Sequence, residues 1–237
     1  MNILSRIAAT ALVCLAGAMA HAQSTAVSDN EGLVLVKSKM LDKAWLLPGA
    51  DFRPYKKVLL KEAEVAFQKN WVRDMNANRA TLTGPKVTDA DALKIVQEAR
   101  TGFNETWADT FKANGWEVVK APGEDVLQVR PAVINLYVNA PAAAASGTSR
   151  SYTVEAGEAT LLLEVRDSRT GTLLGRFADR RQTTNSPRAQ MTDSVTNRAQ
   201  FGSLFTNWAG IAAKGLKNLQ ASSPLPETLK AGQKVQK

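Results

Sequence analysis

The chain has 237 residues, with 30 Lys and Arg against 22 Asp and Glu, which gives a net charge of +8. Its one cysteine, Cys14, and its one histidine, His21, both lie within the first 22 residues. If that segment is removed, Cys/His zinc sites, cysteine nucleophiles, Ser-His-Asp triads, haem ligation by histidine and disulfides are all excluded. We therefore expect no metal site and no cofactor.

The first 22 residues have the three regions of a secretory signal peptide. Arg6 supplies the positive charge, an apolar run extends from Ile7 to Met19, and small residues surround a cleavage site after Ala22. The run is shorter than the about 20 residues that a membrane-spanning helix needs. We expect residues 1–22 to be removed and the mature protein to be periplasmic. Lipid anchoring at Cys14 is disfavoured, because Val13 is too large for the position before a lipidated cysteine and the apolar run continues beyond it.

The positive charge indicates which partners the exported protein would meet. Anionic lipid head groups and other envelope polyanions would attract it weakly and in a salt-sensitive way. Contact with a membrane would then be peripheral, and nucleic acid is not an expected partner in that compartment. Ordinary solubility explains the charge equally well.

The mature chain begins with a polar lead-in segment, residues 23–44. A short strand is expected at residues 45–47, closed by the turn pair Pro48-Gly49. The Val- and Leu-rich segment 55–67 predicts a strand of a half-solvated sheet. Residues 70–87 show no periodicity and are expected to form a loop.

The clearest helix begins at Thr88. Thr88 and Asp91 resemble a capping box, and Asn114-Gly115 is a natural C-terminal stop. One apolar stripe at helical spacing lies between them. It consists of Leu93, Val96, Phe103, Trp107 and Phe111.

The second half predicts further strands at residues 116–119, 126–138, 153–166 and 172–183. In the segment 126–138 the alternation slips after Pro131, which indicates a bulge or an edge position there. Residues 139–151 are small and polar, and predict a mobile loop. A second amphipathic helix is expected over about residues 196–220. Its apolar stripe is Phe201, Leu204, Phe205, Trp208, Ile211, Ala212, Leu216 and Leu219.

Runs of strands with two helices predict the α+β class. We expect a mostly antiparallel sheet of about five to six strands with two amphipathic helices packed on one face. These elements form a single domain over residues 45–220, and residues 221–237 are expected to be a disordered basic tail.

Several short motifs, in this order and spacing, resemble a known bacterial family. They are Pro48-Gly49-Ala50-Asp51 with Tyr55-Lys56-Lys57-Val58, Asn70-Trp71-Val72-Arg73-Asp74, Arg130-Pro131-Ala132-Val133 with Asn139-Ala140-Pro141, Ala156-Gly157-Glu158, Asp167-Ser168, Thr170-Gly171, Asp179-Arg180-Arg181 and Trp208-Ala209. Together they are similar to family 3313 of domains of unknown function, whose members are exported and often labelled lipoproteins. The resemblance implies an envelope protein, and it supplies no reaction, cofactor or catalytic residue.

The densest charged cluster lies on the last two predicted strands. Arg166 and Arg176 would be close across the hairpin and, with Arg180 and Arg181, could bind a carboxylate or phosphate. The alternative is a solvated sheet face neutralised by Asp167 and Asp179, with Asp179 paired to an arginine.

Two further features have a functional and a structural interpretation. Asp167 and Gly171 bound a five-residue connection, which a turn begun by Asp explains better than a metal loop. Trp71, next to Arg73, could contact a sugar or a partner protein, although packing against the sheet is the simpler interpretation.

The sequence favours a non-enzymatic binding or structural component of the envelope, whose partner is an unknown envelope protein or an anionic surface component. A hydrolase that acts on an envelope glycan through two carboxylates is one alternative, and a polyanion or lipid-surface binder is another. The glutamates available on predicted strands are Glu62, Glu64, Glu155, Glu158 and Glu164. Their spacing selects no pair, and the oligomeric state is left open.

Overall fold

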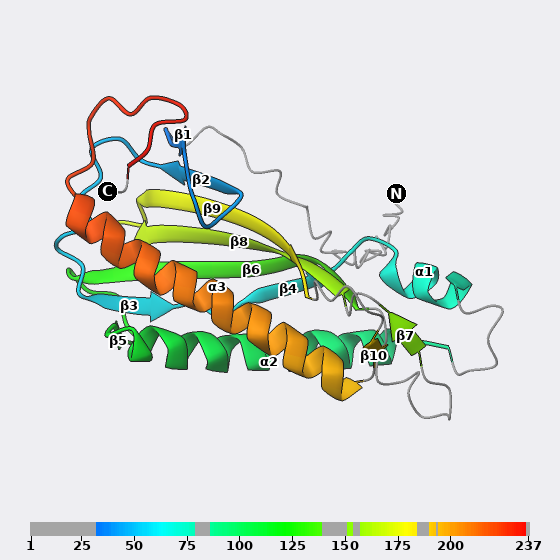
Figure 1. The fold of residues 1–237 in the computed structure, drawn as a ribbon. Coiled ribbons are helices and arrows are strands. Elements are labelled where there is room, and N and C mark those ends of the chain that lie inside the picture. The colour runs from blue at the N-terminus through cyan, green and yellow to red at the C-terminus, as the bar shows by residue number, and fades with distance from the viewer. Residues whose placement is uncertain are drawn as a thin grey trace, which may run out of the picture.

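An eight-stranded mixed sheet forms one layer of the molecule, and two long helices cover one of its faces (Figure 1). This computed structural model describes residues 32–78, 86–138, 151–153, 157–183, 190–192 and 194–235. The strand order is β1-β2-β9-β8-β6-β3-β5, with β4 paired to β6 beyond the end of β3. The strands of this sheet are β1 (Val34–Val36), β2 (Lys43–Leu46), β3 (Lys57–Leu60), β4 (Glu64–Phe67), β5 (Glu117–Val118), β6 (Val126–Val138), β8 (Gly157–Asp167) and β9 (Leu173–Gln182). A separate pair is formed by β7 (Ser151–Thr153) and β10 (Gln190–Thr192).

The α+β class predicted from the sequence is confirmed, but the sheet is larger and less uniform than expected. The neighbours from β1 to β6 are antiparallel, whereas β3 and β4 run parallel to β6, and β5 runs parallel to β3. Eight strands replace the predicted five to six for two reasons. The segment 55–67 divides into β3 and β4, and β1 forms inside the predicted lead-in segment.

The irregularity of β6 does not lie at Pro131. The register with β8 shifts between Ile134 and Tyr137, where Asn135 has φ 51°. Pro131 is paired with Leu163 of β8 and falls after the residues of β6 that pair with β3 and before those that pair with β4. The N–H that proline lacks is therefore not needed by either parallel neighbour.

Helix α2 (Asp89–Ala113) has both predicted ends. The Thr88 side chain accepts from the Asp91 N–H while Asp91 accepts from the Thr88 N–H, and Gly115 follows the C-cap with φ 76°. Phe103 and the next two aromatic residues of the stripe are buried. Leu93, however, is 64% exposed. The inward face at the start of α2 consists of Ala92, Ile95 and Ala99 instead.

Helix α3 (Ser194–Ser222) crosses the sheet diagonally, with α2 beside it (Figure 1). All residues of its predicted stripe are buried except Ile211, which is half-buried. The strand β8 alternates between buried and half-buried positions, so the helices cover one face of the sheet while the other face meets solvent. In the part of the chain that the structure describes, none of the helices has the length and hydropathy to cross a bilayer.

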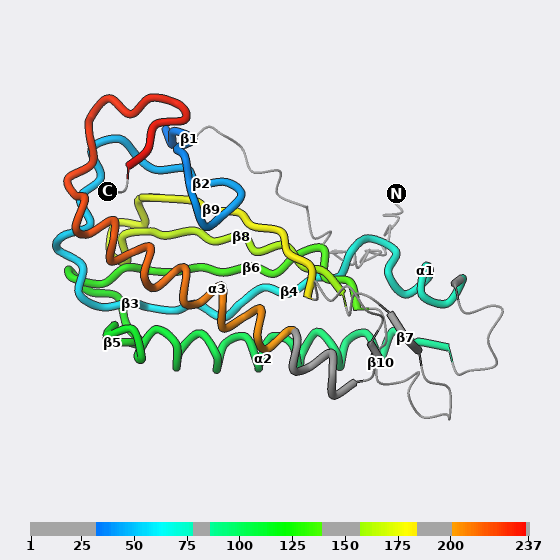
Figure 2. The backbone as a smooth tube through the Cα atoms, in the orientation of Figure 1, coloured from blue at the N-terminus to red at the C-terminus, as the bar shows by residue number. Residues whose placement is uncertain are grey.

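Two segments expected to be irregular are ordered. Residues 70–87 contain helix α1 (Trp71–Asn78), while 79–85 lie outside the described residues. The predicted disordered tail instead folds back toward β1, as Figure 2 shows for residues up to 235. Its backbone bonds explain the order, because the Leu225 N–H donates to the Ala50 carbonyl and the Lys37 N–H to the Gln233 carbonyl. The predicted signal peptide and its cleavage site lie outside the described residues, as do residues 139–150 of the predicted mobile loop 139–151, whose last residue, Ser151, begins β7.

Candidate functional site

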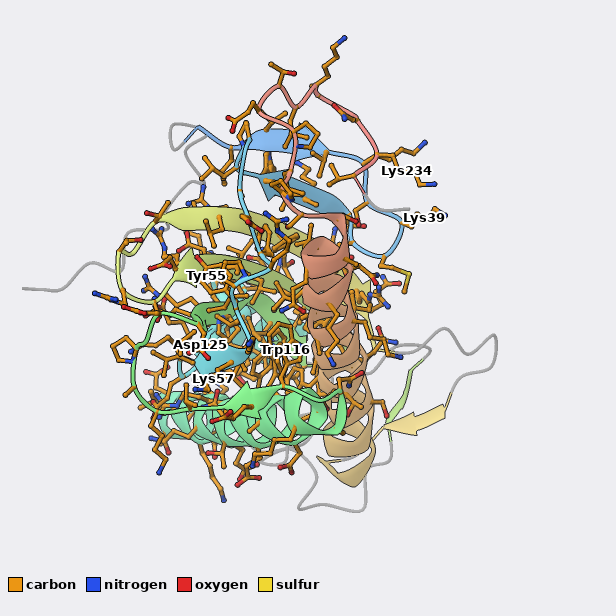
Figure 3. The ribbon with its side chains drawn as sticks, turned by 90° about the vertical axis from the view of Figure 1, so that its left-hand side faces the viewer. Lys39, Tyr55, Lys57, Trp116, Asp125 and Lys234 are labelled. Carbon is orange, nitrogen blue, oxygen red and sulfur yellow. The ribbon has the colours of Figure 1, made fainter. Side chains whose placement is uncertain are left out.

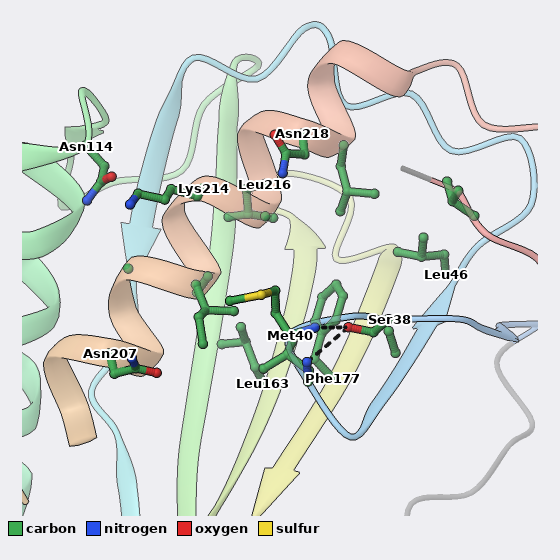
Figure 4. Close-up of a pocket in the computed structure, with 18 of the residues that line it drawn as sticks. Ser38, Met40, Leu46, Asn114, Leu163, Phe177, Asn207, Lys214, Leu216 and Asn218 are labelled. Atoms are coloured by element: carbon green, nitrogen blue, oxygen red, sulfur yellow. Dashed lines mark hydrogen bonds between the residues drawn. The ribbon is translucent and has the colours of Figure 1, made fainter. Parts of the chain in front are cut away.

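A cavity of about 610 Å³ lies on the helix-covered side of the sheet, between α3 and the β1–β2 connection (Figure 4). Leu46, Leu163 and Phe177 of three neighbouring strands line it from the sheet side. Its other apolar lining residues are Val36, Met40, Leu41, Ala44, Ile211, Ala212, Leu216, Leu219 and Val235. The cavity therefore joins the sheet, α3 and the C-terminal segment.

Missing side chains on α3 keep this space open. Gly210 and Gly215 line the cavity, and a Cβ added at either position would meet nothing within 4 Å. Opposite them, Met40 is 58% exposed on the β1–β2 connection and points toward α3 (Figure 4). The Ser38 hydroxyl fixes this connection by accepting hydrogen bonds from the N–H groups of Met40, at 3.3 Å, and Leu41, at 3.1 Å.

The polar part of the lining consists of hydroxyls, amides and two ammonium groups. These residues are Lys37, Ser38, Thr110, Asn114, Thr206, Asn207, Lys214 and Asn218. None of the lining residues is Asp, Glu, His or Cys, and the described residues hold no group of three or more such side chains placed to bind a metal ion. Apolar walls with a few polar groups are the usual composition of a small-molecule binding site.

A buried carboxylate, Asp179 on β9, joins the walls of the cavity. Asp179 is 3% exposed, and its side chain accepts from Trp208 Nε1 at 2.7 Å, Arg181 Nε at 2.6 Å and the Asp42 N–H at 3.1 Å. These donors come from α3, from β9 itself and from the β1–β2 connection. The predicted pairing of Asp179 with an arginine is therefore present, and Arg181 is that arginine.

Arg181 extends the same network to two residues that line the cavity. One nitrogen donates to Asn207 Oδ1 at 2.9 Å and another to the Met40 carbonyl at 3.0 Å. The hydrogen bonds thus fix the distance between α3 and the β1–β2 connection at one end of the cavity.

The structure brings Arg166 and Arg176 together on the opposite, uncovered face of the sheet. Both donate to Glu164, Arg166 Nε at 3.1 Å to Oε2 and Arg176 Nη2 at 2.9 Å to Oε1. Burial raises the pKa of Glu164, but the hydrogen bonds from the two arginines outweigh it and leave that pKa below its usual range. A charged carboxylate therefore stands between the two guanidinium groups.

The remaining residues of the predicted cluster are divided between the two faces. Arg180 is exposed on the uncovered face and pairs with Glu158 at 2.6 Å. Arg181 belongs to the Asp179 network, on the covered face. The four arginines thus do not form one cationic surface.

The glutamates considered for a hydrolase do not face one another across the cavity. Glu64, Glu158 and Glu164 each pair with an arginine. Glu155 lies outside the described residues, and Glu62 does not line the cavity.

Trp71 is packed, as the simpler interpretation of the sequence expected. It is 2% exposed, stacks on Phe67 with ring centroids 4.0 Å apart, and donates from Nε1 to the Val138 carbonyl at 3.3 Å. A sugar or partner protein therefore cannot reach its ring. Arg73, two residues later, is exposed and pairs with Asp74 at 2.9 Å, and it lies on α1, not with the arginines of β8 and β9.

The connection from Asp167 to Gly171 is the predicted turn. Asp167 Oδ1 accepts from the N–H groups of Arg169 at 2.9 Å and Thr170 at 2.7 Å, and Oδ2 accepts from the Tyr55 hydroxyl at 2.8 Å. Burial raises the pKa of Asp167, but these bonds reverse the shift and lower it. Gly171 has φ 74°, which favours glycine. The carboxylate of Asp167 is thus occupied within the turn.

The cavity could not be predicted from the sequence, because ordinary apolar residues line it. One signal was available. Gly202, Gly210 and Gly215 interrupt α3 at a cost of about 1 kcal/mol each relative to alanine. Of these, Gly210 and Gly215 line the cavity, so glycines within a predicted helix were the sequence feature that marks this surface.

Comparisons with known proteins supply a family but no activity. A search of the curated proteins gives no match. Among solved structures, the PelC dodecamer from Paraburkholderia phytofirmans is 12% identical, with a TM-score of 0.35 and coverage of 75% of this chain and 96% of that one. The protein XCC0632 from Xanthomonas campestris, of family DUF330, is 13% identical, with a TM-score of 0.37 and coverage of 74% and 90%. Likenesses this low say nothing about a ligand or a partner. The chain does match the family described as "Protein of unknown function (DUF3313)" over residues 22–210, and it therefore belongs to that family.

Proposed function

We propose that this protein is an exported, non-enzymatic binding protein of the cell envelope, and that it holds an apolar ligand in the cavity between α3 and the β1–β2 connection. The observation that carries the proposal is the open space of about 610 Å³ with apolar walls and no lining carboxylate. Pockets for small molecules have volumes of roughly 300–1,000 Å³ and are mostly apolar with a few polar groups.

The energetics favour an occupied cavity. A methylene group moved from water into apolar surroundings gains about 0.8 kcal/mol. Met40, Phe177 and Ile211 are all partly exposed along the cavity and would lose water contact to a ligand. The predicted signal peptide supports the location, since an exported binding protein meets envelope lipids and other amphiphiles.

The test is binding of a neutral fluorescent apolar probe, N-phenyl-1-naphthylamine, to the chain that starts at Gln23. We expect saturable binding, and Met40→Asp should weaken it about tenfold, which corresponds to 1.4 kcal/mol. Leu93→Asp is the matched control, because Leu93 is an exposed apolar residue that does not line the cavity. No binding by the unaltered chain, or equal weakening by both variants, would refute the proposal.

The location is tested separately by the mass of the protein recovered from intact cells. A mature N-terminus at Gln23 in the periplasmic fraction is expected. A diacylated chain that starts at Cys14, or an uncleaved chain in the cytoplasm, would contradict it.

A further inference from the structure

Two lysines are backbone neighbours at the edge of the cavity. Lys37 lines the cavity and forms an isolated parallel bridge with Lys234 of the C-terminal segment. The residue after Lys234, Val235, also lines the cavity. Lys39 projects at the same edge of the molecule as Lys234 (Figure 3). Among the described residues, none of these three ammonium groups has a carboxylate partner.

The two positive charges of Lys37 and Lys234 do not contribute to attaching the C-terminal segment. Like charges directly opposite each other on neighbouring strands are destabilising. The C-terminal segment is attached through its backbone, by the Lys37 N–H to the Gln233 carbonyl and the Gly232 N–H to the Leu35 carbonyl, both 2.9 Å. Uncharged side chains would keep these bonds, so the two charges are not needed for attachment. An anion between them would relieve their repulsion.

We infer that the ligand is a single-chain amphiphile with an anionic head. Its chain occupies the apolar cavity and its head lies at Lys37 and Lys234. The inference rests on the proposed function, to which it adds the chemical class of the ligand. It follows from the continuity of the two surfaces, because Lys37 itself lines the cavity and Lys234 directly precedes the lining residue Val235. The cavity volume of about 610 Å³ lies within the usual range for one small-molecule ligand.

The experiment is displacement of the bound naphthylamine probe by compounds that share a twelve-carbon chain and differ in the head. Dodecanoate and dodecyl phosphate are the anionic forms, dodecanol is neutral and dodecyltrimethylammonium is cationic, all below their micelle concentrations. We expect the anionic forms to bind about three- to tenfold more tightly than dodecanol, since exposed ion pairs contribute about 0.2–1 kcal/mol each. A difference between the carboxylate and the phosphate identifies the preferred head.

The double variant Lys37→Gln/Lys234→Gln should lose this preference, so that the anionic forms and dodecanol bind it about equally. The control is Lys43→Gln/Lys112→Gln, which removes the same net charge from the uncovered sheet face and from α2. If dodecanol and the anions bind equally, or if the control double variant loses the preference as much, the head-group inference is overturned while the proposed function stands. If neither the probe nor dodecanol binds, the proposed function itself fails.

Discussion

Two buried tryptophans offer a direct measure of what the Asp179 network contributes to stability. Trp107 is 1% exposed and Trp208 is 0% exposed, and both stack against phenylalanines. They differ at the ring nitrogen. Trp208 Nε1 donates to Asp179 at 2.7 Å, whereas Trp107 Nε1 has no hydrogen-bond partner among the described residues. Substitution by phenylalanine removes a similar apolar area at both sites, so the difference isolates the hydrogen bond.

We expect Trp208→Phe to cost more free energy of unfolding than Trp107→Phe. A hydrogen bond to a charged group contributes about 1.5–3 kcal/mol, and its loss leaves the Asp179 carboxylate buried with one donor fewer. At Trp107 the same change removes an unpaired buried N–H, which partly offsets the lost packing. The difference should therefore be at least about 1.5 kcal/mol.

The assay is urea unfolding of the mature chain followed by far-ultraviolet circular dichroism, because fluorescence would change with the tryptophan itself. The slopes of the transitions must agree for the comparison to hold. Equal losses, or a larger loss for Trp107→Phe, would refute the reasoning that Asp179 depends on its three donors.

Two further changes test the sheet. Gly157→Ala should destabilise the protein by about 1–3 kcal/mol, because the added Cβ would lie 2.0 Å from the Tyr137 carbonyl oxygen. The control is Gly202→Ala on α3, which should not destabilise, because a Cβ there meets nothing within 4 Å. The stability of both variants is measured by thermal melting. The pKa of Glu164 is lower in the folded protein than in the unfolded chain, so the unfolded chain takes up this proton first as the pH falls. Glu164 therefore stabilises the fold above its ordinary pKa of 4.5, and this contribution is lost as the pH falls through the lower folded-state pKa. Glu164→Gln should therefore show a smaller fall in unfolding free energy between pH 6 and pH 3 than the unaltered chain, and an equal fall would contradict the assigned cause.

Elements with strong local signals could be predicted from the sequence. The hairpin of β8 and β9 has alternating side chains and a turn begun by Asp167, and α2 has its own caps. In both cases neighbouring residues supply the bonds that define the element. The residues that form the turn and the cap thus lie within a few positions of each other in the sequence, where a pattern can reveal them.

Elements stabilised by distant residues could not be predicted. The sequence of the C-terminal segment is polar and predicts disorder, but the segment bonds to Lys37 and Ala50, which lie far earlier in the chain. Trp71 begins a helix too short to show a period, and its burial depends on Phe67 and the end of β6. The candidate site also depends on distant residues. A cavity forms where side chains from several elements leave space between them, and their relative positions cannot be predicted from local sequence patterns.

The Asp179 network connects stability to the geometry of the cavity. An apolar side chain of similar size could often replace a buried charged group without loss of stability. Such a side chain would pack against Trp208, but it could not fix the direction of the Asp42 N–H or of Arg181. Those two donors determine where the β1–β2 connection lies, and Arg181 also holds the Met40 carbonyl. Asp179 is therefore best explained as a residue that keeps the two walls of the cavity apart at a defined distance, which apolar packing alone would tend to close.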